Sequence, residues 1–183
     1  MRLTLASASP QRRAILEMVG IPFEVRATGV EELSSGDPRH VAAENARRKA
    51  LAAPGPLVLG ADTDVALDGD ILGKPADAAQ ARTFLERLSG RTHDVVGGIA
   101  LAEDGRLVAE AVVVTPVRFR DLDTGLIDWY VETGEWRGRA GGYAIQGKGA
   151  ALVAGVEGDY LNVVGLPLVR LLELRPDLLP TAP

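Results

Sequence analysis

The chain has 183 residues, the length of one ordinary domain or two small ones, and 46% apolar with 25% charged residues is the composition of a globular protein. Cysteine is absent and only two histidines are present, which excludes disulfides, thiolate metal sites and multi-histidine zinc sites. A metal would therefore be a hard cation held by carboxylates, and the net charge of -5 argues against a nucleic-acid partner.

No apolar run is long enough for the core of a signal peptide or for a membrane helix. We therefore expect a cytoplasmic protein with no membrane partner. Among 20 basic residues only three are lysines, namely Lys49, Lys74 and Lys148. Either the scarcity of lysine reflects neutral replacement by arginine, or these three lysines occupy functional positions that require the small ammonium group of lysine.

The first half of the chain alternates predicted strands and helices. A short strand at Leu3–Ala6 leads into a helix that Ser9 caps and that begins at Pro10, and Gly20 ends it. A second strand follows at 23–27. Asp37-Pro38 opens a second helix in the same way, and the prolines from Pro54 onward break it.

In the second half, the apolar run 57–61 predicts a strand that ends on Asp62-Thr63-Asp64, before a hairpin that turns at 68–69. Asp77 and Gln80 form a capping box for a third helix that Gly90 closes. A long antiparallel hairpin over 95–119, a glycine-rich stretch at 138–149 and a final helix at 166–174 complete the pattern. We expect one α/β domain over residues 1–183, built on a mixed sheet.

The first candidate for chemistry is the strand-to-helix turn Ser7–Arg13. Free backbone N–H groups at a helix start favour a phosphate, and Arg12 and Arg13 stand where cations are unusual unless an anion is bound. The plain alternative is that both arginines are solvated.

A second candidate is Asp62, which we expect beyond the carboxyl end of its strand, where an aspartate can hold Mg²⁺ or activate a water. A simple turn would also explain it. Asp64 would share its face only if the strand continued. The hairpin brings Lys74, between Gly73 and Pro75, beside Asp62 as a phosphate contact or a loop charge.

Other segments offer weaker candidates. Glu31-Glu32 is a metal-binding carboxylate pair or a solvated face, and Lys49 reaches a phosphate or snorkels. In the glycine-rich stretch Gln146 can read a base edge, unless the stretch is a surface loop. His93 lacks a catalytic partner, and we take it as structural.

In order along the chain, these blocks resemble the Maf family of nucleoside triphosphate pyrophosphatases. The matching residues are Leu5–Pro10 with Arg12-Arg13, Glu31-Glu32, Lys49-Ala50, Gly60–Thr63, Gly73–Pro75, Leu88–His93, Ala140-Gly141, Ile145–Gly147, Gly158–Tyr160 and Val164–Leu168. The resemblance implies the fold of the Maf and inosine triphosphatase group, an elongated, twisted mixed sheet with flanking helices and a cleft between two lobes.

The resemblance also implies hydrolysis of a nucleoside triphosphate between its α and β phosphates, with Asp62 as proton acceptor and Mg²⁺ or Mn²⁺ as cofactor. Glu32 and Asp62 would hold the metal, and a cytoplasmic homodimer is implied. The residues implied for the triphosphate are Ser7, Arg12, Arg13, Lys49 and Lys74.

Base preference is implied by three positions. Thr63 and Gln146 resemble the family members that act on dTTP and UTP rather than on 7-methyl-GTP, whereas Gln11 replaces the arginine or tryptophan of the two groups. We expect dTTP and UTP as substrates, with breadth toward other or modified pyrimidine nucleotides. The alternatives are a non-catalytic, nucleotide-binding regulator of cell division and a phosphatase that removes the terminal phosphate.

Overall fold

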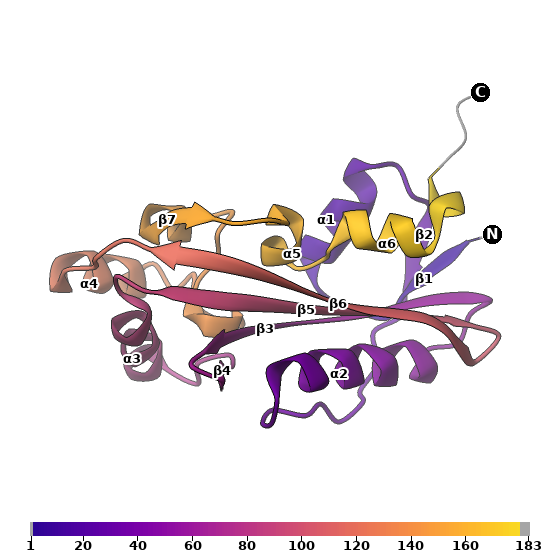
Figure 1. Cartoon of the computed structure of the whole chain (residues 1–183), viewed down its shortest axis with the longest axis horizontal. Coiled ribbons are helices and arrows are strands. Elements are labelled where there is room, and N and C mark those ends of the chain that lie inside the picture. Colours follow the sequence, from indigo (N-terminus) through magenta and orange to yellow (C-terminus); the bar gives the residue numbers. More distant parts are fainter. Residues whose placement is uncertain (1, 180–183) are drawn as a thin grey trace.

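A mixed sheet of seven strands forms the frame of the protein, which a computed structural model describes over residues 2–179 (Figure 1). The strand order is β2-β1-β3-β5-β6-β7, with β4 paired to β3. β1 runs parallel to β2 and β3, and the other pairs are antiparallel. The strands are β1 (Leu3–Leu5), β2 (Phe23–Val25), β3 (Leu57–Leu67), β4 (Asp70–Leu72), β5 (Thr92–Glu103), β6 (Arg106–Phe119) and β7 (Val153–Val156).

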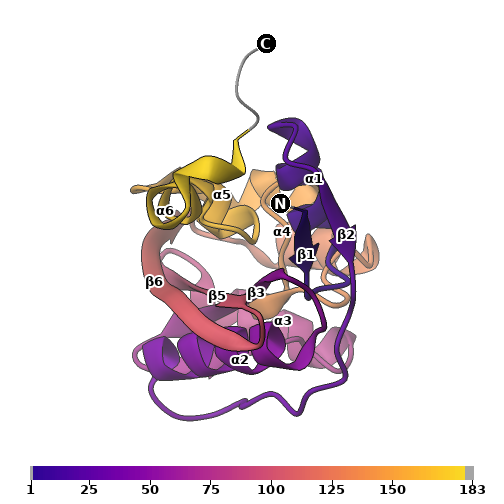
Figure 2. The same cartoon turned by 90° about the vertical axis from the view of Figure 1, so that its right-hand side faces the viewer.

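Helices cover both faces and one end of this sheet. In Figures 1 and 2, α2 lies below β3, β5 and β6, whereas α1, α5 and α6 lie above the sheet, and α3 and α4 gather at the end far from the N-terminus. The helices are α1 (Pro10–Met18), α2 (Pro38–Ala52), α3 (Ala78–Leu88), α4 (Thr124–Glu132), α5 (Tyr160–Val164) and α6 (Leu168–Leu174), with 3₁₀ turns at Ala140–Gly142, Lys148–Leu152 and Pro176–Leu178.

The predicted helix starts are confirmed. The side chains of Ser9, Asp37 and Asp77 each accept a hydrogen bond from a backbone N–H in the first turn, which satisfies a donor that the helix leaves free. The predicted turn at 68–69 is present as well, and the long hairpin also turns at an Asp-Gly pair, since Asp68 and Asp104 have positive φ values of 55° and 48° and a positive-φ glycine follows each.

The prediction that a strand ends at Asp62 is wrong. β3 continues to Leu67 because Gly60–Ala66 stay paired with β5 throughout. On its other side, β3 pairs with β1 only up to Leu59 and with β4 only from Val65. Asp62 therefore lies in the middle of a strand, where that edge is open between two short neighbours.

Alternation along β3 sends Asp62 and Asp64 toward α2, and Thr63 toward α1. The approach of α2 is very close: a Cβ at Gly60 would lie 2.0 Å from the carbonyl oxygen of Ala46, and one at Gly98 would lie 2.1 Å from that of Ala42. Any side chain at either glycine would push the helix away from the sheet.

The two larger of the apolar clusters among the described residues fill the two ends of the molecule. One packs β1, α1 and α6 around Leu5, Leu16 and Leu171, and the other packs α3 and α4 around Leu85, Phe119 and Tyr130. The sequence patterns predicted no element for α4, α5 or β7. α5 and β7 are too short to show periodicity, and α4 is rich in aromatic and β-branched residues, which are weak helix formers.

Candidate functional site

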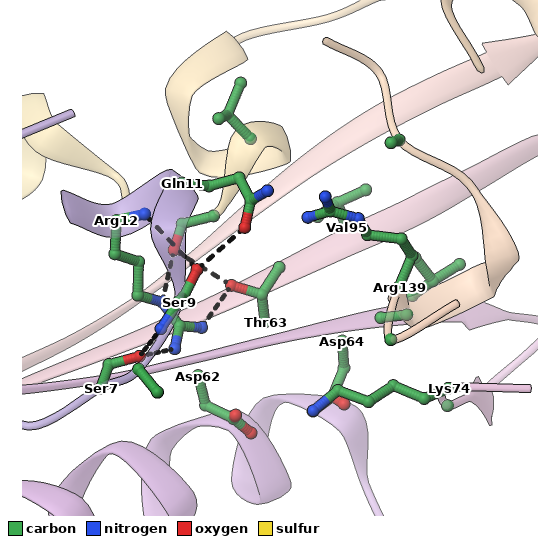
Figure 3. A pocket seen from close by; sticks show the side chains of 18 of the residues that line it. Ser7, Ser9, Gln11, Arg12, Asp62, Thr63, Asp64, Lys74, Val95 and Arg139 are labelled. Carbon is green, nitrogen blue, oxygen red and sulfur yellow. Dashed lines mark hydrogen bonds between the residues drawn. The ribbon is translucent and has the colours of Figure 1, made fainter. Parts of the chain in front are cut away.

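A cavity of about 930 Å³ opens along the free edge of β3 (Figure 3). Its walls come from the β1–α1 turn, β3, α2, the segment after β4 and the stretch between α4 and β7. All but one of the residues that the family resemblance implies for the site line it, namely Ser7, Gln11, Arg12, Glu32, Lys49, Asp62, Thr63, Lys74 and Gln146.

Arg13 is the exception. It is exposed, does not line the cavity, and its guanidinium lies 4.0 Å from the carboxylate of Glu17 one helical turn away. Consecutive residues of a helix point about 100° apart, so burying Arg12 turns Arg13 outward. We therefore leave Arg13 out of the proposed site.

Asp62 is the most tightly held carboxylate of the cavity. The residue is 6% exposed, with Oδ1 2.8 Å from the Lys49 ammonium and Oδ2 accepting a 2.8 Å hydrogen bond from the Asn45 amide. Lys49 also lies 3.1 Å from a carboxylate oxygen of Glu32. Lys49 thus bridges two carboxylates, whereas the sequence analysis expected it on a phosphate.

Asn45 is a site residue that sequence reasoning missed. It is buried and joins Asp62 to the loop before α2, because its side chain also accepts from the Leu33 N–H at 2.7 Å and donates to the Leu33 carbonyl at 2.9 Å. The available signal was its spacing: Asn45 and Lys49 are four residues apart, and so share one face of α2.

Asp64 lies on the same face as Asp62 because β3 continues past both. Burial and the neighbouring charge of Asp62 raise the pKa of Asp64 to about 7, and the nearby Lys49 partly opposes this rise. Its Oδ2 atom is buried and has no hydrogen-bond partner among the described residues. Asp64 therefore brings to the cavity wall a carboxylate oxygen that lacks a hydrogen-bond donor.

Arg12 is a buried cation held by neutral oxygens. It donates to the Gly165 carbonyl at 3.0 Å, to the Ser7 hydroxyl at 2.9 Å and to the Thr63 hydroxyl at 3.1 Å. Burial lowers the pKa of Arg12, and the negative charges of Asp62 and Glu32 oppose that shift. Its guanidinium joins α1, β3 and the α5–α6 turn at one point.

Further cations line the cavity on the side opposite Ser7 and Arg12. Figure 3 shows Lys74 and Arg139 there, and Arg137 also lines the wall, packed over the Trp136 ring at 4.7 Å. Within residues 2–179, none of these three side chains forms an ion pair with a carboxylate. A group of unneutralised cations in a cavity favours a polyanionic ligand.

The sequence analysis gave no role to Arg137 or Arg139. The signal was their position, since Arg139 lies inside the glycine-rich stretch and Arg137 just before it, where the backbone can approach a ligand closely. Gln11 lies at the start of α1, where its amide oxygen accepts a 3.1 Å hydrogen bond from the Ser9 hydroxyl. Lys148 is absent from the lining.

The donor chemistry fits a hard divalent cation that shares its coordination with a substrate. Glu32, Asp62 and Asp64 offer carboxylate oxygens to the cavity, yet no group of three acidic, histidine or cysteine side chains among residues 2–179 forms a protein-only metal site. Mg²⁺ is commonly held by one or two carboxylates together with substrate phosphates and waters.

The fold and the cavity define an α/β protein that handles a phosphorylated ligand. The chain belongs to the Maf family, since the model for "Maf-like protein" matches residues 2–176.

Three similar proteins are each named dTTP/UTP pyrophosphatase. The chain is 50% identical over 180 residues to a dTTP/UTP pyrophosphatase of Symbiobacterium thermophilum, with 94% of this chain and 92% of that protein covered. It is 51% identical over 180 residues to one of Myxococcus xanthus (93% and 91% covered), and 43% identical over 181 residues to one of Pyrococcus furiosus (94% and 93% covered).

The matches among solved structures are more distant. A dITP/XTP pyrophosphatase of Mycobacterium abscessus has a TM-score of 0.44 at 21% identity, with 67% of this chain and 76% of that chain covered. The Ham1 protein of Staphylococcus aureus has a TM-score of 0.47 at 16% identity, with 66% and 73% covered. Within residues 2–179, each helix is too short or too polar to cross a membrane.

Proposed function

We propose that this chain is a nucleoside triphosphate pyrophosphatase that hydrolyses dTTP and UTP to the monophosphate and pyrophosphate. The observation that carries the proposal is one cavity that contains both a restrained, buried carboxylate, Asp62, and cations without carboxylate partners. The names of three relatives at 43–51% identity support the same activity and the same substrates.

The triphosphate binds between the two cationic walls of the cavity. Arg12 and Ser7 contact it from the β1–α1 side, and Lys74 and Arg139 contact it from the opposite side. Because Arg12 is already fixed by neutral oxygens, it offers its remaining N–H groups without losing side-chain entropy on binding. Such pre-positioned charge stabilises the negative charge that develops on the leaving pyrophosphate.

Asp62 accepts the proton of the attacking water. The water oxygen forms a bond to the α-phosphorus, the bond to the α–β bridging oxygen breaks, and pyrophosphate leaves. Lys49 and Asn45 each bind one oxygen of Asp62, which fixes the direction in which its remaining lone pairs point. Lys49 thus acts on the carboxylates rather than as a direct phosphate contact.

Glu32 and Asp62 would hold a divalent cation, Mg²⁺ or Mn²⁺, with Asp64 as an additional oxygen donor. When bound, this cation neutralises phosphate charge and lowers the pKa of a coordinated water. Glu32 suits the task because its side chain is 46% exposed and turns toward the cavity while it contacts Lys49.

The base is read by Gln146 and Gln11. Gln146 offers one donor pair and one acceptor, which match the carbonyl and N–H edge of thymine or uracil. Thr63 acts indirectly, since its hydroxyl accepts from Arg12 and donates to the Gly165 carbonyl. The amide of Gln11 carries no positive charge, so we expect this enzyme to accept other or modified pyrimidines as well.

The test is a panel of nucleoside triphosphates with Mg²⁺ or Mn²⁺, in which pyrophosphate and orthophosphate are measured separately. We expect dTTP and UTP to give pyrophosphate and monophosphate in equal amounts. Orthophosphate with a nucleoside diphosphate would identify a terminal phosphatase instead. Binding without turnover of any substrate would favour the nucleotide-binding regulator of cell division.

The resemblance to the family also supports a cytoplasmic homodimer, which we keep as a prediction. Light scattering on the purified chain would test it, because a dimer has twice the mass of the 19.3 kDa chain.

A further inference from the structure

The segment that carries Gln146 is anchored at both ends by side chains near the end of α4. At its start, the Ala144 N–H donates to the Tyr130 hydroxyl at 3.0 Å. At its end, the N–H groups of Lys148 and Gly149 donate to the two carboxylate oxygens of Glu135 at 3.0 and 2.9 Å. Tyr130 is fully buried, so the first anchor is part of the core.

Glu135 lies directly against this segment. A Cβ at Gly147 would lie 2.0 Å from a carboxylate oxygen of Glu135, so only glycine leaves room for the carboxylate between its two donors. Partial burial raises the pKa of Glu135, but the N–H donors of Lys148 and Gly149 bring it below its ordinary value. The carboxylate is therefore ionised at neutral pH, where charge-assisted bonds to N–H groups are strongest.

The contacts of Glu135 are separate from those that keep the segment folded. Tyr143 is buried and Ile145 packs against the core around α3 and α4, so the chain up to Ile145 is held by apolar contacts. Gln146 and Gly147 follow that support, and both line the cavity. After Gly147, the chain is held by the hydrogen bonds of the Lys148 and Gly149 N–H groups to Glu135.

We propose that Glu135 is a positioning residue that holds Gln146 where it reads the nucleotide base. This inference rests on the proposed pyrophosphatase function. Base selectivity would then depend on two side chains: the Gln146 amide, which faces the base, and the Glu135 carboxylate, which holds the backbone N–H groups that follow Gln146. Removal of Glu135 should release Gln146 while the catalytic carboxylate, on β3 and held from α2, stays in place.

The test compares Glu135→Ala and Glu135→Gln with Glu132→Ala, a matched control at an exposed glutamate of the same region that does not line the cavity. For Glu135→Ala we expect KM for dTTP to rise about tenfold or more, since bonds to a charged group are lost. The value of kcat should stay within about threefold of the wild type. Glu135→Gln keeps one acceptor oxygen and should give an intermediate KM, and Glu132→Ala should match the wild type.

A double-mutant cycle with Gln146→Ala separates positioning from general destabilisation. If Glu135 acts through Gln146, the double variant has a KM no higher than the worse single variant. Additive effects, an unchanged KM, or a loss confined to kcat would overturn the proposal. Should Glu135→Ala fail to fold, the same cycle is run with Glu135→Gln.

Binding of a non-hydrolysable α,β-imido analogue of dTTP, measured by calorimetry, gives a readout that does not depend on turnover. We expect its Kd to rise in parallel with KM in both Glu135 variants, and an unchanged Kd would refute the positioning role. If the wild type released no pyrophosphate, the proposed function would fail by itself, and the result would not be attributed to Glu135.

Discussion

Replacing Asp62 by Asn changes both the charge and the hydrogen bonding at the centre of the cavity. In the native site, one oxygen of Asp62 accepts from Lys49 and the other accepts from Asn45, each at 2.8 Å. An amide has only one oxygen. It can satisfy one of these donors, and it must then turn its own NH₂ group toward the other.

The structure sets the size of two separate effects of Asp62→Asn. A buried donor left unsatisfied costs about 1–3 kcal/mol, which for a chain of this length lowers Tm by about 2–12 °C. Loss of the proton acceptor should lower kcat by about 10²–10⁴-fold. The affinity for the α,β-imido analogue should change much less, because the cations that grip the phosphates remain.

The assay measures pyrophosphate release below the melting transition of the variant, with calorimetric binding of the analogue in parallel. Asp94→Asn is a matched control, since Asp94 is exposed and does not line the cavity. If Asp62→Asn kept kcat within tenfold of the wild type, Asp62 would not be the base. A loss of affinity as large as the loss of rate would refute the separation of catalysis from binding.

Three further predictions concern a cation, the metal and pH. Lys74→Ala should raise KM and lower kcat by about tenfold or more in steady-state assays, because a charge-assisted phosphate contact is lost; unchanged kinetics would place Lys74 outside the site. EDTA should abolish pyrophosphate release and added Mg²⁺ or Mn²⁺ should restore it, whereas activity that persists in EDTA would remove the metal from the scheme. Burial lowers the pKa of His93 to about 4 from its ordinary value of 6.5. The unfolded chain therefore binds the proton first, and as pH falls from about 6.5 to about 4 the protein should lose up to about 3 kcal/mol of stability. Urea unfolding at both pH values measures this loss, which should be smaller in His93→Gln; an equal loss would exclude His93 as its source.

Helix starts and tight turns could be predicted from the sequence, because each depends on only a few neighbouring residues. Ser9 before Pro10 and Asp37 before Pro38 predicted the starts of α1 and α2 because a capping side chain acts within three residues of itself. The Asp-Gly turns were equally readable, since only a few residue types adopt two successive positive φ values. His93, which we took as structural, is buried, with its ring 2.8 Å from the hydroxyl of Tyr143.

The residues around Asp62 could be predicted only in part. Polar residues after an apolar run marked the site, but the strand was expected to end where β3 in fact continues, because pairing with β5 is decided by residues 28 or more positions away. The two ion pairs of Lys49 were not predicted for the same reason. Its position on α2 was visible in sequence, whereas the two carboxylates it bridges come from β3 and from the loop before α2.

The sequence by itself determined the family resemblance, the starts of α1, α2 and α3, the tight turns and a set of site residues of which all but Arg13 line the cavity, since each depends on residue type and short spacing. Only the tertiary structure decided that Arg13 faces outward, that Asn45 supports Asp62, and that Arg137 and Arg139 join the cationic walls. These outcomes depend on contacts between segments far apart in the chain, such as the 153 residues that separate Arg12 from Gly165. Such contacts follow from how β1, β3 and α2 pack together, which no local pattern encodes.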